Sequence, residues 1–143
     1  MKMTTAELTA FLDAEFPQMR PMRMRIEHWD GRSMRVAMPI AEQNLRPGNT
    51  VSGPAMMTLA DCAAYLLLLG LIGPVALAVT TNLNINFLRK PGMGELSAEA
   101  SMLKLGKTLA IIEISLFSAG VDEPVAHSVM TYAIPPGAIP PKA

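Results

Sequence analysis

The chain has 143 residues, a single cysteine, and twelve acidic and twelve basic side chains, so its formal net charge is zero. This length suits one domain with its own core, and we expect a single domain over 1–143. The balanced charge excludes the basic footprint that nucleic acids or an anionic membrane surface would need. One cysteine, Cys62, cannot form an internal disulfide, and the N-terminal residues lack a signal-peptide pattern, so we expect a cytoplasmic protein.

The first part of the chain predicts a short helix, a hairpin and a loop. Apolar residues recur at helical spacing before a proline, and then alternate with charged residues on either side of an Asp-Gly turn. In chain order we expect a helix from Thr4 or Thr5 to Phe16 within a lead-in over 1–20, strands over 22–29 and 33–38, and a polar loop over 39–51.

The next segment predicts one long buried helix. Ser52 can act as its N-cap, and Pro54 suits the first turn, where a missing N–H has no intrahelical partner. Residues 55–69 are mostly good helix formers, and Gly70 is a natural stop. Because this helix is apolar on nearly every side, we expect other elements to surround it.

A membrane span is the alternative for this apolar region. Residues 63–79 carry no charge, but the run is a little short for a span, and Gly70, Gly73 and Pro74 interrupt it. A buried core helix is therefore the preferred interpretation.

The few polar side chains of this helix form one stripe. Thr58, Asp61, Cys62 and Tyr65 stand at positions i, i+3, i+4 and i+7, and Asp61 is the only charge of the helix. A buried carboxylate needs hydrogen-bond partners or a changed protonation state. Asp61 is thus either a structural acid satisfied by a hydroxyl or a turn amide, or a catalytic carboxylate that faces a cleft.

The rest of the chain predicts antiparallel strands. Over 81–87 the alternation puts Thr81 and three apolar residues on the helix side and the three asparagines on the outer side. Further strands are expected over 95–105, 108–117 and 125–134, and an extended proline-rich tail over 135–143. A sheet around one central helix is the α+β arrangement that would cover such a helix.

Three segments carry a resemblance to a known family. They are Ser52-Gly53-Pro54 with Leu59-Ala60-Asp61, then Asn84 to Pro91, and then Leu105-Gly106-Lys107. Together they resemble the hotdog-fold acyl-CoA thioesterases of the PaaI-like, phenylacetic-acid-degradation group, over about residues 20–134. The resemblance implies a hotdog fold, in which an antiparallel sheet wraps around one long central helix.

The resemblance also implies catalytic roles. The family acid, which activates water or attacks the thioester, falls on Asp61, and the amide that polarises the thioester carbonyl falls on Gly53. A hydroxyl that places water matches Thr81. The family histidine is replaced by Ser52, and the family's second glycine by Pro54. The Gly53 amide survives both changes, and a helix N-terminus suits a developing oxyanion.

The expected partner is an acyl-CoA substrate. Arg89 and Lys90 match basic residues that can meet coenzyme A phosphates, and Lys107 is a weaker candidate. Coenzyme A is part of the substrate, so no separate cofactor is expected, and the sequence has no metal-ligand spacing. Family members form sites between subunits, so we expect a homodimer or a dimer of dimers.

The resulting hypothesis is hydrolysis of acyl-CoA thioesters, with Asp61 as general base or nucleophile. A non-catalytic acyl-CoA binding protein is the alternative from another class, because the family histidine is missing. A dehydratase of the same fold is the third, and it would need a histidine paired with the acid.

Overall fold

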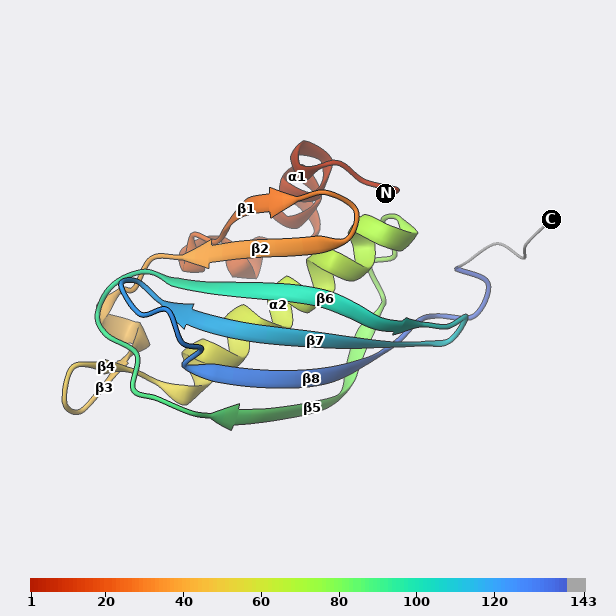
Figure 1. Ribbon diagram of the computed structural model, residues 1–143. Helices are drawn as coiled ribbons and strands as arrows, with labels where there is room; N and C mark the ends of the chain where they lie inside the picture. Colours follow the sequence, from red (N-terminus) through yellow and green to blue (C-terminus); the bar gives the residue numbers. More distant parts are fainter. Residues whose placement is uncertain (139–143) are drawn as a thin grey trace.

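The computed structural model describes residues 1–138, so the last part of the expected proline-rich tail lies outside the described residues. Six strands form one antiparallel sheet in the order β1-β2-β6-β7-β8-β5, and a long helix, α2, lies across one face of it (Figure 1). In chain order the elements are α1 (Thr5–Glu15), the 3₁₀ helix η1 (Pro17–Met22), β1 (Arg25–Trp29), β2 (Ser33–Met38), η2 (Glu42–Asn44), β3 (Leu45–Arg46), β4 (Thr50–Val51), α2 (Gly53–Ile72), β5 (Val79–Phe87), β6 (Leu96–Leu105), β7 (Leu109–Ser118) and β8 (Ala126–Ala133).

The α2 helix begins as its sequence predicts and ends later. The Ser52 hydroxyl accepts a hydrogen bond from the Ala55 amide at 3.3 Å, which is the expected N-cap. The expected stop at Gly70 is wrong: the helix continues to Ile72, and Gly73, at φ 102°, ends it. Gly70 serves packing instead, because a Cβ there would lie 2.5 Å from the Trp29 ring. A glycine with no room for a side chain lets strand β1 approach the helix closely.

The core lies between α2 and the inner face of the sheet. The strands supply it by alternation, so Val36, Ala98 and Leu116 face the helix and are fully buried. Helix α2 is long and apolar enough to cross a membrane, with a mean hydropathy of 1.9 over its most apolar window, but 67% of that window is buried inside the fold. It is therefore a core helix, as the sequence predicts.

The two edges of the sheet are protected differently. The edge strand β1 is short, carries charges at Arg25 and Glu27, and lies beside α1 (Figure 1). The opposite edge, β5, is nine residues long with no charge and no proline. Charges, short length and a covering helix are devices that block pairing with another chain, and β5 has none of them. Strand β5 is therefore the open edge of this sheet.

The N-terminal segment folds against the same helix. Thr4 caps α1 through a reciprocal pair of bonds with Glu7, as the sequence predicts for a helix beginning at this point. The predicted first strand begins later than expected, because the 3₁₀ helix η1 occupies its first residue. The end of α1 and η1 then pass close to α2, where they form part of the site described next.

Candidate active site

Asp61 lies in a pocket of about 630 Å³, called here the Asp61 pocket. The middle of α2, the segment leading into β5 and the end of β8 form its floor, and the end of α1 with η1 forms its wall. The whole polar stripe predicted on α2 lines this pocket. The lining residues are Glu15, Phe16, Gln18, Met19, Thr58, Asp61, Cys62, Tyr65, Ala76, Ala78, Val79, Thr80 and Tyr132.

Two hydroxyl groups hold the Asp61 carboxylate. Thr80 Oγ1 donates to Asp61 Oδ1 at 2.6 Å, and the Tyr132 hydroxyl lies 2.5 Å from the same oxygen. The Tyr132 hydroxyl also lies 2.9 Å from the Asp61 carbonyl oxygen. Within residues 1–138, no hydrogen bond engages Asp61 Oδ2. The half-buried carboxylate thus has one oxygen fixed and the other free for a ligand or water.

Several titratable groups beside Asp61 are buried, and burial shifts their pKa values. Burial, and then the Asp61 charge, raises the pKa of the Tyr132 phenol. This hydroxyl therefore keeps its proton and acts as a donor. Burial, and then the Asp61 charge, raises the pKa of the Cys62 thiol to about 12. Burial also raises the pKa of Tyr65, whose hydroxyl donates to the Ala76 carbonyl at 2.9 Å. Electrostatic interactions are stronger in such a site than in bulk water.

The hydroxyl beside Asp61 is not the one that the sequence predicts. Thr81 was expected on the helix side, and this placement is wrong: its hydroxyl donates to the Thr131 carbonyl at 3.2 Å, and the residue is exposed. The cause is a bulge, because Thr80 pairs with Tyr132 and Asn82 with Thr131, which leaves Thr81 as the extra residue. A bulge shifts the alternation by one residue, so Thr80 faces the helix instead.

Gly53 lies in a second pocket, of about 500 Å³, called here the Gly53 pocket. It is formed by the N-terminus of α2, the β3–β4 hairpin and the end of β5. Within the described part of the chain no hydrogen bond engages the Gly53 amide, and the Phe87 ring lies close enough that a Cβ on Gly53 would meet it at 3.4 Å. A free N–H at the start of a long helix suits a developing negative charge. Ser52 lines neither pocket and serves as the helix cap.

The predicted basic residues fall at two different ends of the sheet. Arg89 and Lys90 line the Gly53 pocket. Arg89 is also tied to the turn before β8, donating to the Pro124 carbonyl at 2.7 Å and pairing with Glu123 at 2.5 Å. Lys107 lies in the β6–β7 turn, at the end of the sheet where β5 begins, so one chain does not bring it to Arg89 and Lys90 (Figure 1).

Within one chain, Asp61 and Gly53 are too far apart to act on the same carbonyl. They are separated by eight residues of one helix, which corresponds to about 12 Å along its axis. They also open into different pockets, at the two ends of strand β5. A site that uses both residues therefore requires more than one chain.

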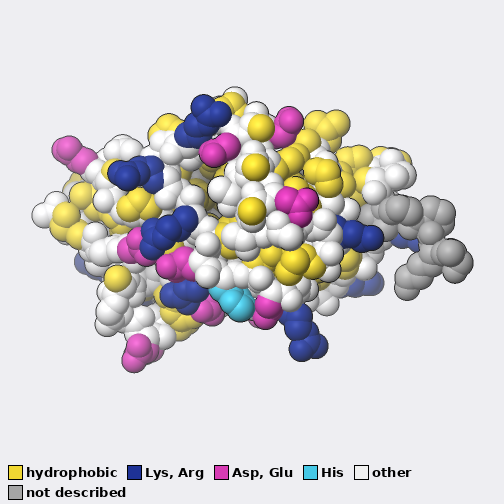
Figure 2. All heavy atoms as spheres, turned by 90° about the horizontal axis from the view of Figure 1, so that it is seen from above, with side chains coloured by type: hydrophobic (Ala, Val, Ile, Leu, Met, Phe, Trp, Pro, Cys, Tyr) yellow, Lys and Arg dark blue, Asp and Glu magenta, His cyan; other side chains and the backbone are white. Residues whose placement is uncertain are grey.

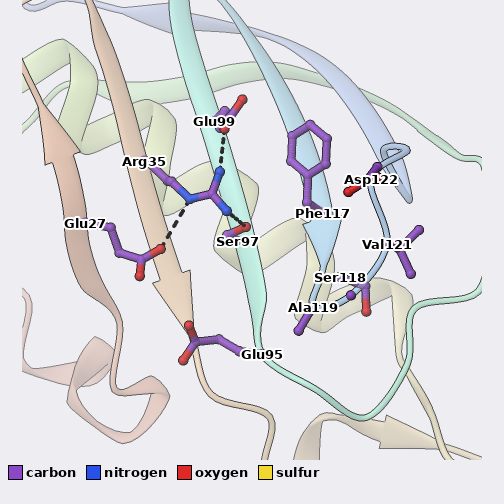
Figure 3. A pocket seen from close by; sticks show the side chains of 11 residues that line it. Glu27, Arg35, Glu95, Ser97, Glu99, Phe117, Ser118, Ala119, Val121 and Asp122 are labelled. Carbon is purple, nitrogen blue, oxygen red and sulfur yellow. Dashed lines mark hydrogen bonds and ion pairs between the residues drawn. The ribbon is translucent and has the colours of Figure 1, made fainter.

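A third hollow, of about 460 Å³, lies on the outer face of the sheet (Figure 3). At its centre, Arg35 bonds to Glu27 at 3.3 Å and to Ser97 at 3.0 Å, and it also pairs with Glu99 (Figure 3). Glu95 pairs with Arg25 at 2.5 Å. Both arginines pair with neighbouring carboxylates, and these side chains are 35–50% exposed, so the hollow is a partly solvated ion-pair network.

The other polar side chains give no competing site among the described residues. His127 pairs with Glu113 at 3.0 Å on the outer face of the sheet, and His28 pairs with Asp30 at 3.2 Å in the first hairpin. Neither histidine lines the Asp61 pocket. Over residues 1–138 no group of three or more His, Cys, Asp or Glu side chains could hold a metal ion. Figure 2, seen from the side of α1, shows acidic and basic side chains interspersed, without a patch of one sign.

Comparison with known proteins identifies the family. The model of the thioesterase superfamily matches residues 48–125, which include α2, β5, the turn with Arg89 and Lys90, β6 and β7. The chain belongs to the thioesterase superfamily. A crystal structure from Silicibacter sp. TM1040, described as a "putative thioesterase", is 46% identical, with 92% of each chain covered and a TM-score of 0.85.

Two more distant relatives are similar to this chain in sequence or in fold. A protein of Thermoplasma acidophilum described as a "putative esterase" is 27% identical over 116 residues, which cover 81% of this chain and 86% of that protein. The PaaI protein of the E. coli phenylacetic acid degradation operon is 21% identical and has a TM-score of 0.74, with 90% of this chain and 95% of that chain covered. The fold is thus the predicted hotdog fold, and the family supports a hydrolase.

Proposed function

We propose that this thioesterase-superfamily protein hydrolyses acyl-CoA thioesters, with Asp61 as the general base. The observation that carries this proposal is the arrangement of the Asp61 carboxylate, which faces a large pocket while two hydroxyl donors fix only one of its oxygens. A structural carboxylate needs partners but no pocket. A catalytic one needs both a fixed orientation and an oxygen free to accept a proton.

The reaction requires one base and one oxyanion donor. Asp61 takes a proton from a water molecule while the water oxygen bonds to the thioester carbonyl carbon. The carbonyl oxygen becomes an oxyanion, which a Gly53 amide stabilises at the helix N-terminus. The C–S bond then breaks, and the sulfur leaves as the thiol of coenzyme A with the proton that Asp61 took from water. If Asp61 instead attacks the carbonyl directly, the same bond breaks, and water later cleaves the resulting mixed anhydride.

A second copy of the chain would bring these two groups together. Strand β5 is a long edge strand without charge or proline, so it can pair with the β5 strand of a second copy. In a two-fold antiparallel pairing, the start of one strand lies beside the end of the other. The Asp61 pocket lies at the start of β5 and the Gly53 pocket at its end. Such a dimer would hold two composite sites, each with Asp61 from one copy and Gly53 from the other.

The substrate would then lie across both pockets. The Asp61 pocket, which is lined by Phe16, Met19 and Tyr65 among others, is suited to an acyl group. Arg89 and Lys90 in the Gly53 pocket could hold the phosphates of coenzyme A. A cytoplasmic location fits this substrate and the single buried cysteine.

The second candidate is an acyl-CoA binding protein without turnover. It is favoured by Ser52, which takes the place of the family histidine and whose hydroxyl is used to cap α2. A thiol-release assay over a panel of short, long and aromatic acyl-CoA thioesters separates the two candidates. Hydrolysis by the wild type, lost in Asp61→Asn, supports the enzyme. Binding of the same thioesters without thiol release supports the binding protein.

A further inference from the structure

Tyr132 reaches the candidate base from a different element of the fold. It lies on β8, is 2% exposed, and its ring stacks on Tyr65 with the ring centroids 6.3 Å apart. Its hydroxyl lies 2.5 Å from Asp61 Oδ1 and 2.9 Å from the Asp61 carbonyl oxygen. Both hydrogen-bond acceptors of this phenol therefore belong to one residue, on the helix across the core.

This double contact fixes the acid in two ways. The contact with the carbonyl oxygen ties the hydroxyl to the helix backbone, and the contact with Oδ1 sets the side-chain rotamer relative to that backbone. A phenol has a single proton, so the short contact to the carboxylate takes most of the donation. Thr80 supplies a second donor to the same oxygen at 2.6 Å. With Oδ1 bonded twice, Oδ2 is left as the reactive oxygen.

We propose that Tyr132 is a positioning residue for Asp61: it holds Oδ1 so that Oδ2 points to the substrate carbonyl or its attacking water. This inference rests on the proposed acyl-CoA hydrolysis. The hydroxyl of Tyr132 acts through Asp61 and does not itself exchange protons with the substrate. Tyr132 also lines the floor of the pocket, and the lining by its ring does not depend on the hydroxyl.

The competing explanation is that Tyr132 only satisfies its own buried hydroxyl. In that case its loss would lower the stability of the fold and leave turnover unchanged. Ser128 offers a matched control on the same strand. It is 1% exposed, and its hydroxyl donates to the Asn84 carbonyl on β5 at 2.7 Å. It is four residues from Tyr132, which corresponds to about 13 Å along the strand.

The test compares Tyr132→Phe with Ser128→Ala in steady-state thiol release and thermal melting. Both variants lose a buried hydroxyl, so both should melt a few degrees lower. In Tyr132→Phe, kcat should fall about 10- to 100-fold with KM nearly unchanged, because a misplaced base costs turnover and not substrate affinity. The acid limb of its kcat/KM–pH profile should also move to higher pH, since a lost donor disfavours the ionised acid. Ser128→Ala should keep both kcat and the position of that limb.

A second variant keeps the hydroxyl and covers the case in which Tyr132→Phe does not fold. With 3,5-difluorotyrosine in place of Tyr132, the hydroxyl is a stronger donor, and the acid limb should move to lower pH. Unchanged kcat and pH profile in these variants, with an active wild type and an inactive Asp61→Asn, would overturn the positioning role alone. An inactive wild type, or an Asp61→Asn variant as active as wild type, would overturn the proposed function and this inference with it.

Discussion

The two ends of strand β5 differ in how their polar groups are held. At its start, the Asp61 carboxylate is half-buried and receives two hydroxyl groups from different strands. At its end, Arg89 is exposed and its guanidinium pairs with Glu123, whose side chain is 69% exposed. The Asp61 end is preorganised by packing, whereas the basic end consists of solvated side chains that can exchange partners.

This difference separates catalysis from affinity. Groups fixed in a buried site act on the transition state, because their geometry is set before the substrate binds. Exposed phosphate contacts stabilise the ground state and the transition state alike. Substitutions at the Asp61 end should therefore lower kcat, and substitutions at the basic end should raise KM.

The largest effect is expected for Asp61→Asn. The amide keeps the shape of the side chain and removes the base, so kcat should fall about 10²- to 10⁴-fold in a thiol-release assay. Binding of a non-hydrolysable acyl-CoA analogue should change little. The melting temperature should hold or rise, because a partly buried charge is removed. A variant that loses about 1–3 kcal/mol of stability and keeps its turnover would show that Asp61 is a structural acid.

The next largest effect tests whether the two pockets are joined by a second copy. The Asn84 side chain is exposed at the middle of β5, so Asn84→Lys should leave the monomer fold intact. In a two-fold pairing centred there, two like charges would face each other and weaken the dimer. A separated chain lacks its oxyanion donor, so kcat/KM should fall about 10²-fold. Light scattering should show the loss of dimer, and Ser115→Lys on the central strand β7 is the control.

A wild type that is monomeric at micromolar concentration would reject the shared site. A monomeric Asn84→Lys variant with full activity would have the same consequence. In either case the Asp61 pocket alone would have to supply the oxyanion donor.

A smaller effect is expected within the Asp61 pocket, for the two neighbouring threonines. Thr80→Val removes one of the two donors to Asp61 Oδ1, so kcat should fall about tenfold. Thr81→Val removes an exposed hydroxyl that bonds only to a backbone carbonyl, so kcat should stay at the wild-type value. Kinetics on the two variants side by side check this. If Thr81→Val lowers kcat and Thr80→Val does not, then Thr81 faces the helix in the active protein, as the alternation over 81–87 predicts.

These two threonines also show where sequence reasoning fails. The polar stripe on α2 and the N-cap were predicted correctly, because helical spacing and capping depend on residues close in sequence. The Thr80 position was missed because a bulge is set by pairing with β8, which no local pattern shows. A signal for Tyr132 was present, since the alternation of the last strand puts a phenol on the apolar face. A buried hydroxyl needs an acceptor, but its partner is 71 residues away in the chain.

The Gly70 stop failed for a related reason. Glycine after a run of helix formers commonly ends a helix, but here it makes room for the Trp29 ring across the core. The choice between these two roles depends on tertiary packing. The wall of the Asp61 pocket also depends on tertiary packing, because α1 and η1 supply it from the N-terminal part of the chain.

At the basic end of β5, Arg89→Ala should raise KM about fivefold with a smaller change in kcat. The guanidinium must leave Glu123 to meet a phosphate, so the gain per contact is modest. The effect should shrink with a short pantetheine thioester, which lacks the nucleotide phosphates. Arg32→Ala, at an exposed position in the first hairpin, controls for a general loss of positive charge. An equal rise in KM on both substrates would refute a phosphate role for Arg89.

The reactivity of Cys62 tests the same contrast without any substitution or change in turnover, because it reports on water in the Asp61 pocket. This thiol is 6% exposed, and burial with the Asp61 charge raises its pKa from 9.0 to about 12. At pH 8 its thiolate fraction is then about 10⁻⁴, so an aromatic disulfide reagent should label it about a thousandfold more slowly than a free thiol. The folded protein should therefore give almost no background in a thiol-release assay, and labelling should become complete on unfolding in guanidinium chloride. Rapid labelling of the folded protein would mean that the pocket is wet and mobile. The contrast between a preorganised acid at one end of β5 and solvated charges at the other would then disappear.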